Sequence, residues 1–302
     1  MSIFVAVPAY RDFELVPTVR DLFAKARHPE RIRVGICWQY AAGEELGPLR
    51  DDPRVTVREI DHRESRGVGW ARARVLELYG GEDHYLQIDS HQRFAPDWDS
   101  ILLDQLDRAP SDKPLLSSWC PAYWPGAEPP ESDPLRMRYD TIDDYGTPTF
   151  IGEPITDWRT RTEPVPTGFV CGHLMFADAR FVAEVPNDPN VYFYGEEIST
   201  AVRAFTWGWD IFAPVRTVMW HLYDDGTVRA RHWADHTDPA AGPTWLDRER
   251  ASRRRVGNLL LYPRPGRYGV GPVRTVADYE AYTGISFAGR TLIPAAAAPC
   301  VP

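Results

Sequence analysis

Residues 85–91 read Tyr-Leu-Gln-Ile-Asp-Ser-His, an apolar strand that runs directly into two side chains able to ligate a metal. Residues i and i+2 of an extended segment lie on the same side of the backbone. The carboxylate of Asp89 and the imidazole of His91 can therefore converge on one divalent cation. A bare Asp-x-His is more often a surface pair beside a turn, so the rest of the sequence has to decide between the two interpretations.

The composition is that of a soluble globular protein. The chain has 302 residues, of which 43% are hydrophobic and 25% charged, enough for one large domain or two small ones. The net charge is −9, and no Lys/Arg-rich tract is interleaved with aromatic residues, which argues against a nucleic-acid partner. No apolar run approaches the ~20 residues of a membrane span.

We expect a cytoplasmic protein without a membrane partner. The first eight residues lack the basic and apolar regions of a signal peptide. The four cysteines are widely spaced and form no C-x-x-C pair, so we expect them to be reduced thiols: Cys37, Cys120, Cys171 and Cys300.

Strands alternate with helices over the first 120 residues. Apolar runs predict strands at 3–7, 31–38, 54–60, 84–88 and 115–119, and helical spacing predicts helices at 14–26, 68–79 and 97–106. This alternation is typical of a doubly wound, mostly parallel α/β sheet. Ligands of such sheets bind outside the carboxyl ends of the strands. The loops that follow the first and fourth strands should therefore share one crevice.

The second half of the chain is less regular. Residues 120–166 hold nine of the 28 prolines and no long periodicity. A loop of this length in a compact domain is usually functional or mobile, so we interpret it as an insertion over the site, with a plain surface excursion as the alternative. Strands are predicted at 168–176 and 217–221, and helices at 197–205 and 245–261. We expect one domain over residues 1–235, followed by an extension over 236–302 that ends in the low-complexity stretch 295–299.

Two basic segments could meet a diphosphate. After the first strand, Arg11 could contact the phosphates while Tyr10 stacks on a base. The plainer interpretation makes Asp12 the N-cap of the next helix, and we favour it when this segment is considered by itself. Residues 63–74 form a glycine-punctuated loop that opens a helix, with Arg66 and Arg72 nearby. Helix N-termini bind anions, but the pattern is neither G-x-G-x-x-G nor a P-loop and is weak by itself.

Two further positions could complete a catalytic centre. Glu196 and Glu197 open a helix, where they could simply complement its dipole or could reach a sugar hydroxyl or the reacting centre. His221 ends a strand, which is more often structural, yet Asp89 and His91 still need a third ligand. An oxygen and nitrogen set with open positions suits Mn²⁺, and Mg²⁺ less well. Such an ion would be the counter-charge for a diphosphate leaving group.

Taken in order, these segments resemble a family of GlcNAc transferases that modify hydroxyproline in a cytosolic ubiquitin-ligase adaptor, together with its bacterial relatives. The resemblance covers roughly residues 3–235. The matching segments are Ile3-Phe4-Val5, Tyr10-Arg11-Asp12, residues 33–39, Ala71-Arg72, residues 87–94, Tyr194-Gly195-Glu196-Glu197, and residues 207–210 through 221–223. The Asp-Ser-His and Gly-Glu-Glu elements also look like those of the mucin-type polypeptide GalNAc transferases.

The resemblance implies a GT-A glycosyltransferase fold and transfer from a UDP-sugar, with UDP-GlcNAc as the donor, to a hydroxyl acceptor such as a peptide. It further implies retention of the donor's α-configuration and a metal held by Asp89, His91 and His221. Glu196 and Glu197 fall at the reacting centre, and the resemblance does not rank them. Residues 167–173 look like the strand that faces sugar and acceptor. The donor contacts that it implies are Pro8, Tyr10, Arg11, Arg66, Arg72, Asp89, Ser90 and Gly172.

The resemblance leaves two regions without a counterpart. The insertion at 120–166 and the tail beyond Asp235 are where acceptor choice would reside. In the tail, the arginine-rich stretch 248–255 could close over the diphosphate as a lid or form a solvated helix face, and we favour the latter. Two other functions stay open: a carbohydrate- or nucleotide-sugar-binding module without turnover, which eleven tryptophans would suit, and a metal-dependent UDP-sugar hydrolase.

Overall fold

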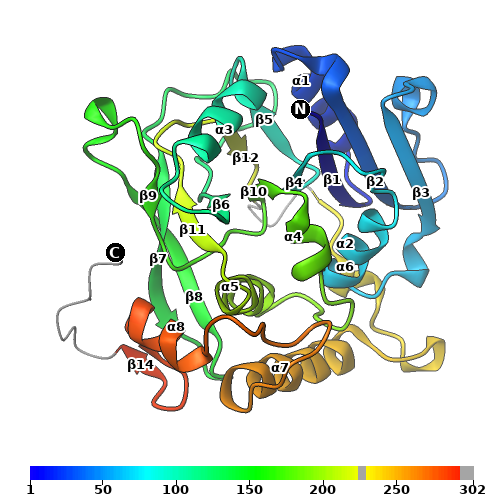
Figure 1. Ribbon diagram of the computed structural model, residues 1–302. Coiled ribbons are helices and arrows are strands. Elements are labelled where there is room, and N and C mark those ends of the chain that lie inside the picture. Colours follow the sequence, from blue (N-terminus) through cyan, green and yellow to red (C-terminus); the bar gives the residue numbers. More distant parts are fainter. Residues whose placement is uncertain (224–228, 293–302) are drawn as a thin grey trace.

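A computed structural model describes residues 1–223 and 229–292 (Figure 1). Its first strand, β1 (Ile3–Tyr10), lies between two apolar cores. Its odd-numbered side chains, Ile3 to Ala9, pack with α1 (Leu15–Lys25) and α3 (Trp98–Asp107). Phe4 and Ala6 face the other core, with α2 (Val68–Leu76) and α5 (Glu196–Thr206). Because helices cover both faces, β1 is apolar throughout.

The central sheet has eight strands and confirms the predicted mostly parallel α/β architecture. The strands lie in the order β3 (Val55–Asp61), β2 (Ile32–Tyr40), β1, β4 (His84–Ile88), β10 (Leu174–Asp178), β6 (Pro114–Ser117), β11 (Asp210–Ala213) and β9 (Val165–Pro166). The first four strands in this order are parallel to one another. β10 runs antiparallel to β4 and β6, β11 is parallel to β6, and β9 is antiparallel to β11.

The reversed direction of β10 determines what lies beside the Asp-Ser-His loop. Leu174, at the start of β10, pairs with Ile88, at the end of β4. Residues 171–173 therefore lie next to Asp89. The predicted strand at 168–176 is wrong in its first half, because the chain turns there and β10 begins only at Leu174.

A separate two-stranded sheet positions His221. It pairs β12 (Met219–His221) with β5 (Gln92–Phe94), and His221 lies opposite Gln92. This register brings the end of the predicted strand at 217–221 beside His91, although outside the central sheet. The short strand β5 was not predicted, because a three-residue run has no readable period.

Residues 120–166 are partly regular. They form the hairpin of β7 (Leu135–Ile142) and β8 (Pro148–Pro154), and they contribute the edge strand β9. The prolines lie mainly in the stretches around this hairpin. Further short elements are α4 (Arg180–Glu184), β13 (Ile285–Ser286) and β14 (Thr291–Leu292).

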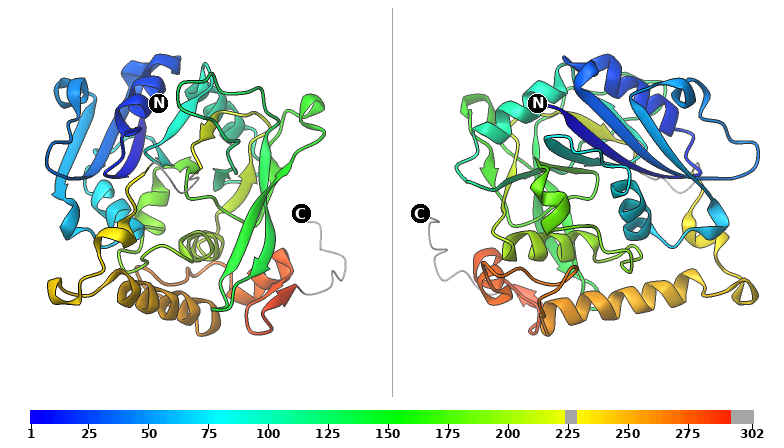
Figure 2. Two further views of the ribbon diagram at one scale, coloured as in Figure 1. Left: turned by 180° about the vertical axis from the view of Figure 1, so that it is seen from behind. Right: turned by 45° about the vertical axis from the view of Figure 1, so that its right-hand side comes forward.

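The chain beyond residue 235 packs on the same core as α5. After α6 (His232–Asp235), the helices α7 (Trp245–Leu261) and α8 (Val276–Thr283) lie along the side of α5 away from α1 (Figure 2). Val256 and Tyr279 are buried in the α5 core. The interpretation of residues 248–255 as a solvated helix face is wrong in part. The Arg253 side chain is only 13% exposed and forms ion pairs with Asp143 and Glu249.

In the described part of the chain, no helix is long and apolar enough to cross a membrane. Cys37, Cys120 and Cys171 are buried free thiols. Cys300 and the low-complexity stretch 295–299 lie outside the described residues.

Candidate functional site

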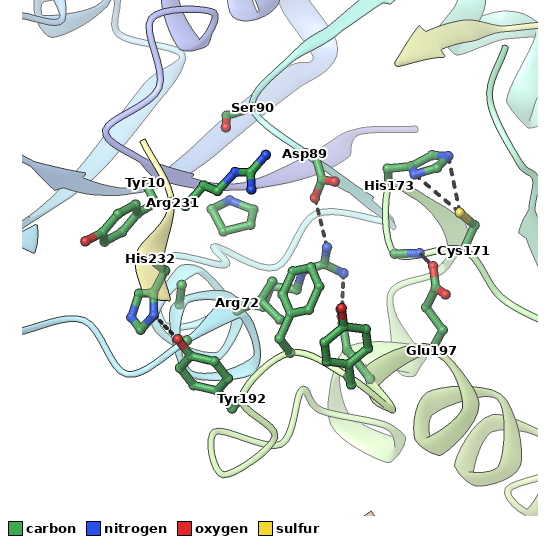
Figure 3. Close-up of a pocket in the computed structure, with 18 of the residues that line it drawn as sticks. Tyr10, Arg72, Asp89, Ser90, Cys171, His173, Tyr192, Glu197, Arg231 and His232 are labelled. Atoms are coloured by element: carbon green, nitrogen blue, oxygen red, sulfur yellow. Dashed lines mark hydrogen bonds and ion pairs between the residues drawn. The ribbon is translucent and has the colours of Figure 1, made fainter. Parts of the chain in front are cut away.

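A cavity of about 530 Å³ opens at the carboxyl ends of β1 and β4 (Figure 3). Its wall combines the loops after these strands with residues 171–173, residues 192–197 before and at the start of α5, and residues 229–233. Ten of the twelve predicted site residues line it: Pro8, Tyr10, Arg72, Asp89, Ser90, His91, Gly172, Glu196, Glu197 and His221. Arg11 and Arg66 do not belong to this wall.

Asp89, His91 and His221 form a group that could hold a metal ion. One ligand atom from each lies within 4.8 Å of the other two, and within residues 1–223 and 229–292 no other group of this kind occurs. The Nε2 atoms of His221 and His91 lie 3.3 and 3.9 Å from Asp89 Oδ2. Both rings thus turn the same nitrogen toward one carboxylate oxygen.

The chemistry of this group fits a divalent cation. Burial lowers the pKa of His221 to about 4, which keeps its imidazole in the neutral form that binds metals. The His91 ring is held through its other nitrogen, Nδ1, which lies 2.7 Å from Asp12 Oδ2. One carboxylate and two imidazoles, with room for further ligands from the cavity, suit Mn²⁺ better than Mg²⁺.

Arg72 joins the metal group to the glutamates. It comes from α2, is 3% exposed, and donates to Asp89 Oδ1 at 2.9 Å and to Glu196 Oε1 at 2.5 Å. Figure 3 shows it below Asp89. Burial alone would raise the pKa of Asp89, but the His221 hydrogen bond and the Arg72 charge hold it well below its usual range. Asp89 is therefore ionised and available as a ligand.

The two glutamates at the start of α5 have different surroundings. Burial raises the pKa of Glu196, and the Arg72 guanidinium opposes this. Glu197 accepts the Gly172 N–H at 2.9 Å and lies beside the Cys171 thiol, and burial raises its pKa to about 7. Each carboxylate contacts a residue from another segment, Arg72 or Gly172, so a role limited to complementing the dipole of α5 does not describe them.

The glycine-punctuated loop at 63–74 does not present the predicted anion site. The N–H groups of Val68 and Gly69 donate to the carbonyls of Tyr192 and Val191, at 2.8 and 3.2 Å. A Cβ on Gly69 would lie 2.4 Å from Val191 O. The glycines therefore allow α2 to pack closely on residues 188–192, and these amides are not free to bind a phosphate. Arg66 is exposed beside them.

The segment after β1 also differs from the prediction. Arg11 forms an ion pair with Asp235 at 2.7 Å, and the Tyr10 hydroxyl donates to the same carboxylate. The N-cap of α1 is Glu14, so the capping role assigned to Asp12 is wrong. Asp12 Oδ1 accepts the Glu14 N–H, and Oδ2 faces His91 and Ser90.

Sequence reasoning gave no individual role to several further cavity residues, although most of them lie in segments that it placed at the site. His173 stacks on His221 with ring centroids 4.4 Å apart, and Trp119 stacks on Tyr223 at 5.5 Å. Phe150 and its neighbours 147–149 bring the insertion to the cavity wall. Asp12 was named only as a helix cap, although its place after β1, at the same sheet edge as Asp89, was a signal for the site. The aromatic residues come from distant segments and carry no such signal.

The chain matches a known protein family along most of its length. A family described as "Glycosyltransferase (GlcNAc)" matches two overlapping stretches, residues 2–53 and 45–289. The chain belongs to this glycosyltransferase family. The family match runs through residues 120–166 and past residue 235, both of which the resemblance noted in the sequence left without a counterpart. No curated protein matches the chain.

Similarity to a solved structure supports the GT-A fold of this chain. A structure of GalNAc-T7 with UDP, GalNAc and Mn²⁺ is similar with a TM-score of 0.59 and 16% identity, over 85% of this chain and 48% of that one. The chain thus spans about half of the GalNAc-T7 chain. S. aureus TarS (residues 1–349) in complex with UDP-GlcNAc gives a TM-score of 0.47 and 14% identity over 87% and 76% of the two chains.

Proposed function

We propose that this protein transfers GlcNAc from UDP-GlcNAc to a hydroxyl acceptor, with the help of a divalent cation and with retention of the α-configuration. One observation carries the proposal: a single cavity joins Asp89, His91 and His221 to Glu196 and Glu197. The family description supports GlcNAc as the sugar. Retention rests on the family resemblance.

Asp89, His91 and His221 would hold the cation, which supplies counter-charge to the departing diphosphate. Other residues of the chain keep these ligands in the protonation state and position that metal binding needs. Arg72 holds Asp89 ionised and in place. Burial keeps His221 neutral. Arg229, which lines the same cavity, adds positive charge where the diphosphate would lie.

We assign the two glutamates different roles. Glu196 forms an ion pair with Arg72, which also binds Asp89, and so links α5 to the Asp-Ser-His loop. Within residues 1–223 and 229–292 Glu197 forms no ion pair, and one of its oxygens accepts the Gly172 N–H. Its other oxygen is the group that would contact the donor sugar. A diphosphate leaving group needs no general acid, so Glu197 serves to hold the sugar and to stabilise the oxocarbenium-like centre.

We assign the acceptor to an aromatic part of the cavity wall. Trp119, Phe150 and Tyr223 line it together with Thr147 and Thr149. A hydroxyl acceptor with apolar faces suits such a wall, because aromatic rings bind apolar surface without charge. Acceptor choice would thus depend in part on the hairpin of β7 and β8.

The test is release of UDP from a panel of UDP-sugars with Mn²⁺, before and after adding candidate acceptors. We expect UDP-GlcNAc to be used best, EDTA to stop the reaction and Mn²⁺ to restore it. Asp89→Ala should lower kcat at least ~10²–10³-fold. Asp107→Ala, an exposed carboxylate at the end of α3, is the control and should behave as the wild type.

Three outcomes would contradict the proposal. Full activity of Asp89→Ala would remove the metal site from the mechanism. Rapid UDP release that no acceptor accelerates would indicate a hydrolase. Calorimetric binding of UDP-GlcNAc without consumption by any acceptor would indicate a binding module.

A further inference from the structure

We infer that Asp12 is a positioning residue of the metal site, which acts by fixing the orientation and tautomer of His91. The inference rests on the proposed metal-dependent function. Asp12 follows β1, and its carboxylate is 5% exposed. Its Oδ2 atom lies 2.7 Å from His91 Nδ1 and 2.7 Å from Ser90 Oγ. It therefore contacts both residues that follow Asp89.

The contact determines which nitrogen of His91 carries the proton. An ionised carboxylate can only accept hydrogen bonds, so His91 Nδ1 must be the donor. In the neutral ring the lone pair is then on Nε2, the atom that faces Asp89 Oδ2 and His221. Metal-bound histidines commonly donate their other N–H to a carboxylate in this way, which fixes the ring and makes the ligand more basic.

Asp12 is itself held in place. Its Oδ1 atom accepts the Glu14 N–H at 2.9 Å, which closes a turn between β1 and α1. Ser90 donates to Oδ2, and the Arg229 guanidinium lies 4.0 Å from the same oxygen. The turn and the Ser90 hydrogen bond hold the carboxylate toward His91. Asp12 thereby ties the end of β1 to the loop after β4.

The first test measures uptake of Mn²⁺ alone, by electron paramagnetic resonance of the free ion, in the absence of donor. We expect Asp12→Ala to weaken Mn²⁺ binding ~10–100-fold. Asp12→Asn keeps an acceptor oxygen and should recover part of this loss. The matched control is Asp52→Ala, since Asp52 also accepts the N–H of the residue two positions on, at 2.9 Å, but its carboxylate bonds to Arg54 instead of a histidine.

The second test separates positioning from a general structural role. In the His91→Ala background, Asp12→Ala should weaken Mn²⁺ binding no further, because its effect passes through His91. An equal loss in both backgrounds would overturn the inference. Folding of each variant is checked by its urea midpoint, so that an unfolded variant is recognised and replaced by Asp12→Asn.

The third test reads the ring directly. Nitrogen NMR of His91 in metal-free protein should show the Nδ1–H form in the wild type and a mixture of tautomers in Asp12→Ala. Retention of the Nδ1–H form in the variant would overturn the positioning role alone. Failure of the wild type to take up any Mn²⁺ would instead overturn the metal part of the proposed function.

Discussion

The Asp-Ser-His loop at 89–91 and the glycine-punctuated loop at 63–74 both contribute to the cavity wall, yet only the first has the geometry that its sequence predicted. In the first, Asp89 and His91 converge, and His221 joins them. In the second, the amides of Val68 and Gly69 are bonded to residues 191 and 192.

The difference lies in what each prediction required. Two side chains at i and i+2 of an extended segment share a side because of the backbone alone. A helix N-terminus binds an anion only if its N–H groups are free, and a segment more than a hundred residues away decides that. A local sequence pattern therefore predicts well which way side chains point, and poorly whether backbone N–H groups are free to bind a ligand.

Arg72 is where the two regions meet, and removing it gives the largest expected effect. In Arg72→Met, the carboxylates of Asp89 and Glu196 lose their buried partner. The free energy of unfolding should fall by ~3–5 kcal/mol, measured by urea denaturation, and UDP release should be lost. Arg74→Met on the same helix removes only a surface pair with Glu77 and should cost less than ~1 kcal/mol. Equal losses would show that the two ion pairs of Arg72 contribute no more to stability than a surface pair.

The next effect concerns the pH dependence of stability. Burial raises the pKa of Glu197 from 4.5 to about 7, so the folded state binds this proton more tightly than the unfolded chain. As the pH rises from about 4.5 to about 7, the wild type should lose stability relative to Glu197→Gln, by on the order of 2–3 kcal/mol. Histidines act in both proteins and cancel in the difference. Denaturation curves that stay parallel across this window would contradict the assignment.

A substitution of Gly69 tests whether this glycine is needed for the packing of α2 against residues 188–192. In Gly69→Ala, the new Cβ would meet Val191 O and Asp188 O at 2.4 and 2.5 Å, and the protein should lose ~1–3 kcal/mol of stability. The control is Gly257→Ala within α7, where nothing lies within 4 Å of the added Cβ; it should gain ~0.5–1 kcal/mol. If Gly69→Ala keeps its thermal midpoint but binds UDP more weakly, the glycine serves the ligand and the packing account is wrong.

Arg66 should give the smallest effect. It is exposed and does not line the cavity, so Arg66→Ala should change the KM for UDP-GlcNAc less than about twofold, since a screened surface charge contributes little. Steady-state kinetics at low salt is the most sensitive assay. An increase in KM of tenfold or more would return this loop to the diphosphate site.

Much of the fold was predictable from periodicity, because long amphipathic or buried segments have a readable period. The strand at 84–88 and the helix at 245–261 have the predicted bounds. The residues around Gly172 did not follow the prediction, since an apolar run before an antiparallel strand looks the same whether it is extended or turned. Of the site, the residues attached to strand and helix ends were found. Asp12 was found but misassigned, because its partner His91 is 79 residues away.

The central claim is that Asp89, His91 and His221 hold one divalent cation at the donor site. Crystals grown with UDP and Mn²⁺ would test it most directly, through the anomalous scattering of manganese. We predict a single strong peak bonded to an Asp89 carboxylate oxygen and to the Nε2 atoms of His91 and His221. A peak bonded to other residues, or UDP bound without any peak among these three side chains, would contradict the claim.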